Sequence, residues 1–267
     1  MRNWILLIAV ALGHAQDSRT GLAACVEGER KAYDEIYSSR RETFLAEPNA
    51  FLVRAIQGRR PGRALDVAMG QGRNAIWLAA NGWEVTGFDI SEKGVAEARA
   101  EATRRQLKID AVVAAYEQFN WGKDRWDLIV FSYFLPKAAL PKVWDALRPG
   151  GLIVVEGFHA DTGRIRPIGG GYHNNELFRV FDRYRILVYE DVEDRQDWGR
   201  EHGAANRLVR VLAQKTVPLP PGCSWKGKAY KTGESMCWGA KWSCGQDGWE
   251  WAGKCEGAAA HSSGISK

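Results

Sequence analysis

The chain has 267 residues, of which 45% are hydrophobic and 26% are charged, and its formal net charge is +5. This length allows one catalytic domain and a smaller addition, and the composition is that of a globular chain with a hydrophobic core. These values exclude a disordered chain, a collagen-like fibre and a polytopic membrane protein. The charge is too small to predict a nucleic-acid partner, and none is expected.

The first residues have the pattern of a secretory signal. Arg2 precedes an apolar run over residues 4–12, and small residues up to Ala15 follow it. This pattern predicts a signal peptide over residues 1–15, and so an exported, periplasmic or cell-envelope protein. The run is too short for a bilayer, which needs about 20 residues. Residues 22–25 resemble a lipoprotein cleavage box, and the alternatives to export are a buried N-terminal helix or a misassigned start.

Further along the chain, residues 27–57 have helical spacing of apolar side chains, interrupted at Pro48. Strands and helices then alternate, which predicts a parallel doubly wound sheet of the α/β class. The predicted strands are 64–67, 84–89, 111–115, 127–132, 152–158, 184–191 and 207–214, and the predicted helices are 74–81, 92–106, 141–147 and 176–181. We expect the last two strands to form an antiparallel hairpin at the edge, which gives a seven-stranded mixed sheet over residues 26–216.

A proline-rich linker over residues 217–222 precedes a tail of different composition. The tail holds five of the twelve Trp and four of the five Cys, at positions 223, 237, 244 and 255. An even set of Cys in an exported chain predicts two disulfides with three possible pairings. Zinc would prefer a paired Cys-x-x-Cys spacing, which is absent from this sequence, so no metal is expected.

We therefore predict a small disulfide-rich β module over residues 223–256, with short strands near 227–230 and 247–251, and a disordered tail over 257–267. The aromatic side chains of the module have two interpretations. They form its core, foremost Trp238 and Trp249, or they contact envelope glycans or another protein.

A glycine loop over residues 65–72 stands where the first predicted strand turns into a helix. Gly70 and Gly72 let the backbone approach a ligand and leave helix amides free to donate hydrogen bonds. With Ala75 and Asp89 the loop also satisfies the dinucleotide fingerprint, so an NAD-binding oxidoreductase is one alternative. Asp66 disfavours it, because a carboxylate there would repel a pyrophosphate and suits an amino group or a fixed water instead.

This loop, together with Leu-Arg-Pro-Gly-Gly at residues 147–151, resembles the class I S-adenosylmethionine-dependent methyltransferases. Residues 64–74, 78–82 and 85–89 are similar to the tellurite-resistance branch, and a weaker similarity extends to about residue 215. The resemblance implies a Rossmann-like fold, S-adenosyl-L-methionine as cofactor, and in-line methyl transfer to a small-molecule acceptor such as a thiol or an oxyanion. The other alternative is an exported envelope binding protein whose methyltransferase fold is inactive.

The resemblance also implies which residues bind the cofactor. They are Asp66, Ala68, Met69, Gly70, Gly72, Asp89, Ile90, Tyr116, Glu117 and Ser132. Asp66 and the loop backbone would hold the amino-acid end, and Asp89 would accept both ribose hydroxyls. Ile90, Tyr116 and Glu117 would surround the adenine, and Ser132 would line the methyl-transfer pocket at the carboxyl edge of the sheet.

Two positions depart from the family pattern, which has Gly at 68 and an acid at 115, whereas both are Ala here. Ala68 is tolerated if its φ is negative. Ala115 removes a hydrogen bond to the adenine amino group worth about 1 kcal/mol, unless Glu117 compensates. Both departures mildly favour the inactive alternative.

Methyl transfer to a soft or anionic acceptor needs no general base, whereas an oxygen or amine acceptor benefits from one. The candidate catalytic residues are Tyr133, at the end of the fourth strand, His159, after the fifth, and Arg207, where the related branch has a basic residue. Further candidates are Glu156, Tyr172, His173 and His202. Trp198 and Gly199 stand where that branch has a His-Arg pair, which puts an oxyanion acceptor in doubt.

Overall fold

The computed structural model describes residues 26–38, 46–164, 171–198, 203–217, 223–238, 240–246 and 248–255. The predicted signal peptide and terminal tail lie outside these residues, as do residues 218–222 of the predicted linker. The chain divides into two compact units, Met1–Thr216 and Val217–Lys267. In the described part of the chain, no helix is both long and apolar enough to cross a membrane.

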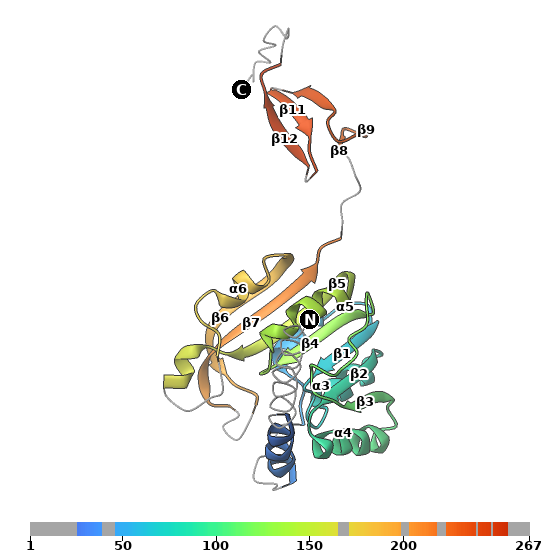
Figure 1. Cartoon of the computed structure of the whole chain (residues 1–267), viewed down its shortest axis with the longest axis vertical. Coiled ribbons are helices and arrows are strands. Elements are labelled where there is room, and N and C mark those ends of the chain that lie inside the picture. Colours follow the sequence, from blue (N-terminus) through green and yellow to red (C-terminus); the bar gives the residue numbers. More distant parts are fainter. Residues whose placement is uncertain are drawn as a thin grey trace, which may run out of the picture. The chain divides into compact units, whose positions relative to one another are not determined.

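The first unit is built on a seven-stranded mixed sheet with the strand order β3-β2-β1-β4-β5-β7-β6 (Figure 1). Its strands are β1 (Arg63–Val67), β2 (Glu84–Asp89), β3 (Ile109–Val113), β4 (Trp126–Ser132), β5 (Leu147–Phe158), β6 (Tyr184–Arg195) and β7 (Ala205–Lys215). The first five are parallel, and β7 is antiparallel to both β5 and β6. The predicted mixed sheet and its edge hairpin are confirmed.

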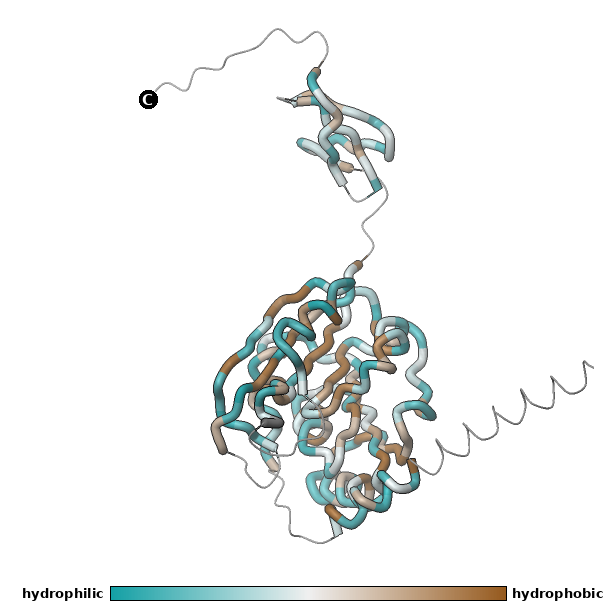
Figure 2. The backbone as a smooth tube through the Cα atoms, turned by 60° about the vertical axis from the view of Figure 1, so that its left-hand side comes forward, coloured by the Kyte–Doolittle hydropathy of each residue, from teal (hydrophilic) through white to brown (hydrophobic). Residues whose placement is uncertain are grey.

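Helices cover both faces of this sheet. The helices of this unit are a helix over residues 26–38, α2 (Ala50–Ile56), α3 (Arg73–Ala80), α4 (Glu92–Arg104), α5 (Leu140–Ala146) and α6 (Glu176–Val180), with short 3₁₀ helices η1 (Lys137–Ala139) and η2 (Ala160–Arg164). Side chains alternate along each strand, so each strand contributes to two cores. One core joins the sheet to α2, α3 and α4, and the other joins it to α5 and α6. Hydrophobic stretches follow the strands of this unit (Figure 2).

The turn from β1 to α3 is made by a loop with three left-handed residues. Ala68, Gly70 and Gly72 have φ values of 53°, 54° and 80°. A Cβ on Gly72 would stand 2.8 Å from the Cβ of Ala98 in α4, so the loop packs directly against that helix. Ala68 therefore does not have the negative φ under which it would be tolerated, because the tight turn requires a left-handed residue at this position.

The second unit contains two small sheets, β8 (Cys223–Trp225) with β9 (Lys228–Tyr230), and β10 (Ser235–Trp238) with β11 (Ala240–Cys244) and β12 (Trp249–Gly253). Its disulfides pair Cys223 with Cys244 and Cys237 with Cys255. The predicted disulfide-rich β module is confirmed, and this pairing selects one of the three possibilities.

The aromatic side chains of the second unit differ from the expected core. Trp238 is 58% exposed, so the expectation that it forms the core is wrong, and Trp251 is 68% exposed. Trp249 is half-buried, contacts the Tyr230 ring and donates from Nε1 to the carbonyl of Ser224. The buried interior is taken by the Cys223–Cys244 disulfide, whose two residues are at most 9% exposed. A covalent link thus replaces part of the aromatic core that the sequence suggested.

The substitution Ala68→Gly should stabilise the first unit. A left-handed conformation costs an L-residue about 1 kcal/mol, whereas Gly adopts it freely, although Gly also gains entropy in the unfolded chain. We expect the free energy of unfolding, measured by urea titration, to rise by about 0.5 kcal/mol. The matched control, Ala79→Gly inside α3, should lower it by about 1 kcal/mol. A similar decrease in the free energy of unfolding of both variants would contradict backbone strain at position 68.

Candidate functional site

Two buried carboxylates flank the glycine loop at the carboxyl ends of β1 and β2. Asp66, 1% exposed, accepts a hydrogen bond from the backbone N–H of Ala75 (3.0 Å), and burial raises its pKa to about 7. Asp89, 5% exposed, accepts from the N–H of Gly70 and of Ser91, both at 2.8 Å, and burial raises its pKa as well. The loop is therefore held between two acids whose carboxylate forms would be stabilised by a cation or by hydroxyl donors.

The segment after β3 lies next to Asp89. The N–H of Ala114 donates to the Asp89 carbonyl (2.9 Å), and the side chains of Ile90, Tyr116 and Glu117 are all half-buried. Ala115 is buried, and its carbonyl accepts from the N–H groups of residues 118 and 119, which makes a tight turn. The residues expected around the adenine are thus brought to the same edge as the loop, and their role in binding stays a prediction.

The helix over residues 26–38 covers this loop, which the sequence did not reveal. The Tyr37 hydroxyl lies 2.5 Å from the place that a Cβ on Gly70 would occupy. Asp34 accepts from Ser91 Oγ (2.5 Å) and from the Lys93 N–H (3.0 Å), which fixes the helix to the start of α4. Burial and then the charge of Asp89 raise the pKa of Tyr37 above its usual range, so this phenol stays protonated. The only sequence signal was the spacing of aromatic residues on one helix face, which is equally typical of a core.

At the end of β4, Tyr133 connects several segments. Its φ is 59°, and its N–H donates to the carbonyl of Glu156 in β5 (2.7 Å). Its hydroxyl donates to Glu156 Oε1 (2.6 Å) and accepts from the N–H of Asp197 (3.2 Å). Burial, followed by the charges of Glu156 and Asp197, raises the pKa of Tyr133 far above its usual range. The phenol therefore keeps its proton, and Tyr133 fits a positioning role better than that of a general base.

Buried polar residues that sequence reasoning missed complete this end of the sheet. Asn49, 1% exposed, donates from Nδ2 to Glu156 Oε1 (2.9 Å) and to Asp197 Oδ2 (3.1 Å). Arg73, the first residue of α3, forms a 2.9 Å ion pair with Asp197 and contacts Ser132 Oγ at 3.4 Å. In the sequence, Asn49 is typical of a helix N-cap, and it does accept from the N–H of Leu52, so nothing indicated its second role.

His159 and Arg207 belong to a different cluster from Tyr133. The Asp161 N–H donates to His159 Nδ1 (3.1 Å), and His159 Nε2 forms a hydrogen bond of 3.0 Å with Asn174 Oδ1. Arg207 pairs with Asp161 at 2.7 Å and with Asp191 at 2.6 Å. The structure therefore connects two of the three predicted catalytic residues to each other through Asp161, and connects Tyr133 to Glu156 instead. A catalytic role for His159 or Arg207 stays a prediction.

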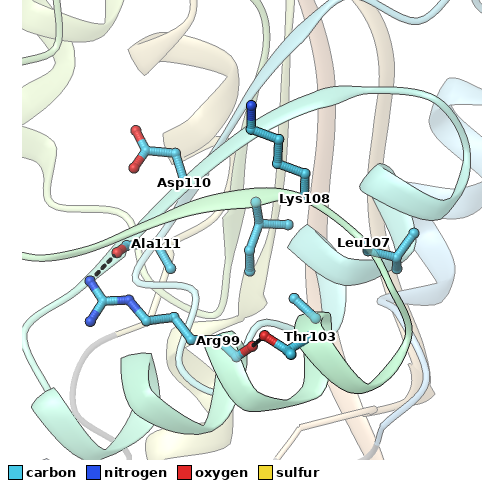
Figure 3. A pocket seen from close by; sticks show the side chains of 8 residues that line it. Arg99, Thr103, Leu107, Lys108, Asp110 and Ala111 are labelled. Atoms are coloured by element: carbon cyan, nitrogen blue, oxygen red, sulfur yellow. Dashed lines mark hydrogen bonds between the residues drawn. The ribbon is translucent and has the colours of Figure 1, made fainter.

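The surface hollow shown in Figure 3 does not belong to this site. Its volume is about 480 Å³. It is lined by Arg99 and Thr103 of α4 and by Lys108 and Asp110 near the start of β3. The start of β3 is the opposite end of the strand from the edge that carries the loop, and the predicted site residues do not line the hollow.

Comparisons with known proteins agree with this geometry. A family model described as a methyltransferase domain matches residues 64–151, which hold the loop, both carboxylates and β4. The demethylmenaquinone methyltransferase of Clavibacter sepedonicus is 30% identical over 223 residues, which cover 73% of this chain and 90% of that protein. The Haemophilus influenzae protein named "Probable S-adenosyl-L-methionine-dependent methyltransferase TehB" is 26% identical over 140 residues, covering 49% of each chain.

A crystal structure of TehB from Haemophilus influenzae has the same fold, with a TM-score of 0.54 at 21% identity, covering 69% of this chain and 67% of that one. The chain spans about half the length of other curated relatives that it matches, such as Hemagglutinin 1 of Eikenella corrodens. Since the similarity to one relative extends over nearly all of that relative's length, and the fold agrees, the chain belongs to the class I S-adenosylmethionine-dependent methyltransferases and is related to TehB.

Proposed function

We propose that this protein transfers the methyl group of S-adenosyl-L-methionine to a small-molecule acceptor by in-line displacement. The observation that carries the proposal is the pair of buried carboxylates, Asp66 and Asp89, on either side of the glycine loop. The cofactor of the family offers these acids an ammonium group and a ribose diol, which are a cation and two hydroxyl donors.

The residues present fit this cofactor. Gly70 has no room for a side chain, because a Cβ there would lie 2.5 Å from the Tyr37 hydroxyl, and its N–H donates to Asp89. When bound, the cofactor would supply an activated methyl group on a sulfonium. The protein's contribution is to hold that group in line with an acceptor at the end of β4, where Ser132 and Tyr133 lie, and this positioning accounts for much of the catalysis of such a reaction.

The two alternatives have less support. An NAD-binding oxidoreductase requires a pyrophosphate at the start of α3, where the buried Asp66 accepts from a helix amide and would repel it. An inactive methyltransferase fold is favoured only by the alanines at positions 68 and 115. Binding measurements with S-adenosylhomocysteine and NAD distinguish all three possibilities.

The substitution Asp89→Asn should weaken the binding of S-adenosylhomocysteine at least tenfold, because the ribose diol would lose a charged acceptor worth about 1.5–3 kcal/mol. Isothermal titration calorimetry at pH 8 measures this effect, with NAD as the second ligand. Asp110→Asn is the matched control, since that residue lies at the other end of the same sheet. This variant should bind S-adenosylhomocysteine with the same affinity as the unaltered protein. Equal affinities for both variants would refute the assignment, and preferential binding of NAD would favour the oxidoreductase.

The affinity for S-adenosylhomocysteine should depend on pH through Asp66. Its pKa in the folded protein is about 7, and an ammonium ligand favours the carboxylate form. Below pH 7 the Asp66 carboxyl group must lose a proton before the ligand binds. The dissociation constant should therefore rise by up to tenfold for each unit by which the pH falls below 7, and it should be constant above pH 7. Calorimetry between pH 5.5 and 8.5 tests this, and Asp66→Asn should remove most of the dependence. A level profile for the unaltered protein would contradict the role of Asp66.

We further propose that the protein is exported and that its second unit contacts envelope glycans. Support comes from the signal-like pattern over residues 1–15, the two disulfides, and the exposed rings of Trp238 and Trp251. A fusion to alkaline phosphatase should be active in the periplasm, and loss of residues 1–15 should abolish that activity.

Glycan contact is tested separately by sedimentation. After lysis, the full chain should sediment with cell-wall glycan, and the double variant Trp238→Ala, Trp251→Ala should not. A fusion without activity would refute export, and equal sedimentation would refute glycan contact.

A further inference from the structure

The short segment Gln196–Trp198, here called the strap, is fastened to the predicted methyl-transfer end of the sheet. Asp197 in the strap accepts from the N–H of Ala50 (3.0 Å) and from Asn49, and it pairs with Arg73. Arg73 also donates to the Asp197 carbonyl (2.7 Å). Because Arg73 directly follows Gly72, these contacts connect the strap to the loop that the cofactor would occupy.

The strap brings an aromatic side chain against two others. The Trp198 ring stacks on the Tyr133 ring, with centroids 5.7 Å apart, and meets the Phe158 ring edge-on at 6.4 Å. Tyr133 and Phe158 contact each other at 4.9 Å. Trp198 is 36% exposed, so part of its surface remains accessible. We call these three rings the aromatic wall. It stands at the carboxyl ends of β4 and β5, next to Ser132.

The charged groups behind the wall are paired within the protein. Glu156, 2% exposed, pairs with Arg210, and Asp197 pairs with Arg73. Both acids also accept hydrogen bonds from Asn49, and Glu156 accepts one from the Tyr133 hydroxyl. An acceptor that meets this wall therefore meets ring surfaces, with the nearby charges already neutralised by their partners.

We infer that the acceptor is a small thiol with an apolar or aromatic body, and that Trp198 determines this specificity. The inference rests on the proposed methyltransferase function. In the reaction, the thiol loses its proton to solvent and its sulfur forms a bond to the methyl carbon. The bond from that carbon to the sulfonium breaks, and its electron pair stays on the cofactor sulfur, which leaves a thioether and S-adenosylhomocysteine.

The physical reason for preferring a thiol is the change in charge during the reaction. A thiolate and a sulfonium are both charged, and both products are neutral, so an apolar wall favours this transfer by replacing water around ions that disappear. A neutral amine acceptor keeps one positive charge throughout and gains less. Sulfur also contacts aromatic rings favourably. A compact oxyanion would need cationic donors, and Arg73 and Arg210 are already engaged by acids.

The test uses the full chain and follows the formation of S-adenosylhomocysteine with benzenethiol, and with phenol, aniline and selenite as alternative acceptors. Benzenethiol should be turned over with a kcat/KM at least tenfold above the other three. Trp198→Ala should raise the KM for benzenethiol at least fivefold and leave the dissociation constant of S-adenosylhomocysteine within twofold. Trp198→Phe should restore most of the loss, and Phe178→Ala, which removes an exposed ring on α6, should have no effect.

Each outcome bears on one of the two proposals. Binding of S-adenosylhomocysteine with preferred turnover of phenol, aniline or selenite would overturn the thiol inference and keep the methyltransferase function. Binding of S-adenosylhomocysteine without turnover of benzenethiol would also overturn the inference, as would an unchanged KM for benzenethiol in the Trp198→Ala variant. Absence of any S-adenosylhomocysteine binding would instead refute the proposed function itself.

Discussion

The site depends above all on the hydrogen bonds that Asp89 accepts at the end of β2. One comes from the N–H of Gly70 in the loop, and the other from the N–H of Ser91, the N-cap of α4. A single carboxylate thus fixes the loop after β1 relative to the helix after β2. Because Ser91 also donates to Asp34, the same connection extends to the helix over residues 26–38. Three segments distant in sequence are held together by one buried acid, and burial is what raises its pKa.

A second buried acid organises the other end of the same edge. Glu156 joins the N-cap of α2, the end of β4 and the middle of β7 through Asn49, Tyr133 and Arg210. A buried charge of this kind is costly unless every partner is in place. The cofactor end and the predicted acceptor end of the site are therefore each built around one carboxylate, and Arg73 connects the two ends through the strap.

The sequence was sufficient for the fold, because the fold follows from local patterns, and it placed the candidate loop and its two acids at one edge of the predicted sheet. Alternating apolar runs predicted the strands and helices, and the loop with Asp66 and Asp89 lies within one β-α-β unit. The acceptor side could not be predicted in the same way, since Asn49 and Glu156 are 107 residues apart and meet only in the folded sheet. The left-handed φ of Ala68, which the tight turn between β1 and α3 requires, was also missed. The exposure of Trp238 was missed because the Cys223–Cys244 disulfide takes the interior of the second unit.

The distribution of cysteine has a consequence for the behaviour of the chain under oxidation. Four of the five Cys form the two disulfides of the second unit, and the first unit has one Cys in its sequence, Cys25, far from the loop along the chain. Its fold therefore does not depend on the redox potential of the surroundings, whereas that of the second unit does. A reducing agent would release the small sheets of the second unit and leave the methyltransferase unit folded. One chain thus combines a unit whose fold depends on disulfides with a unit whose fold does not.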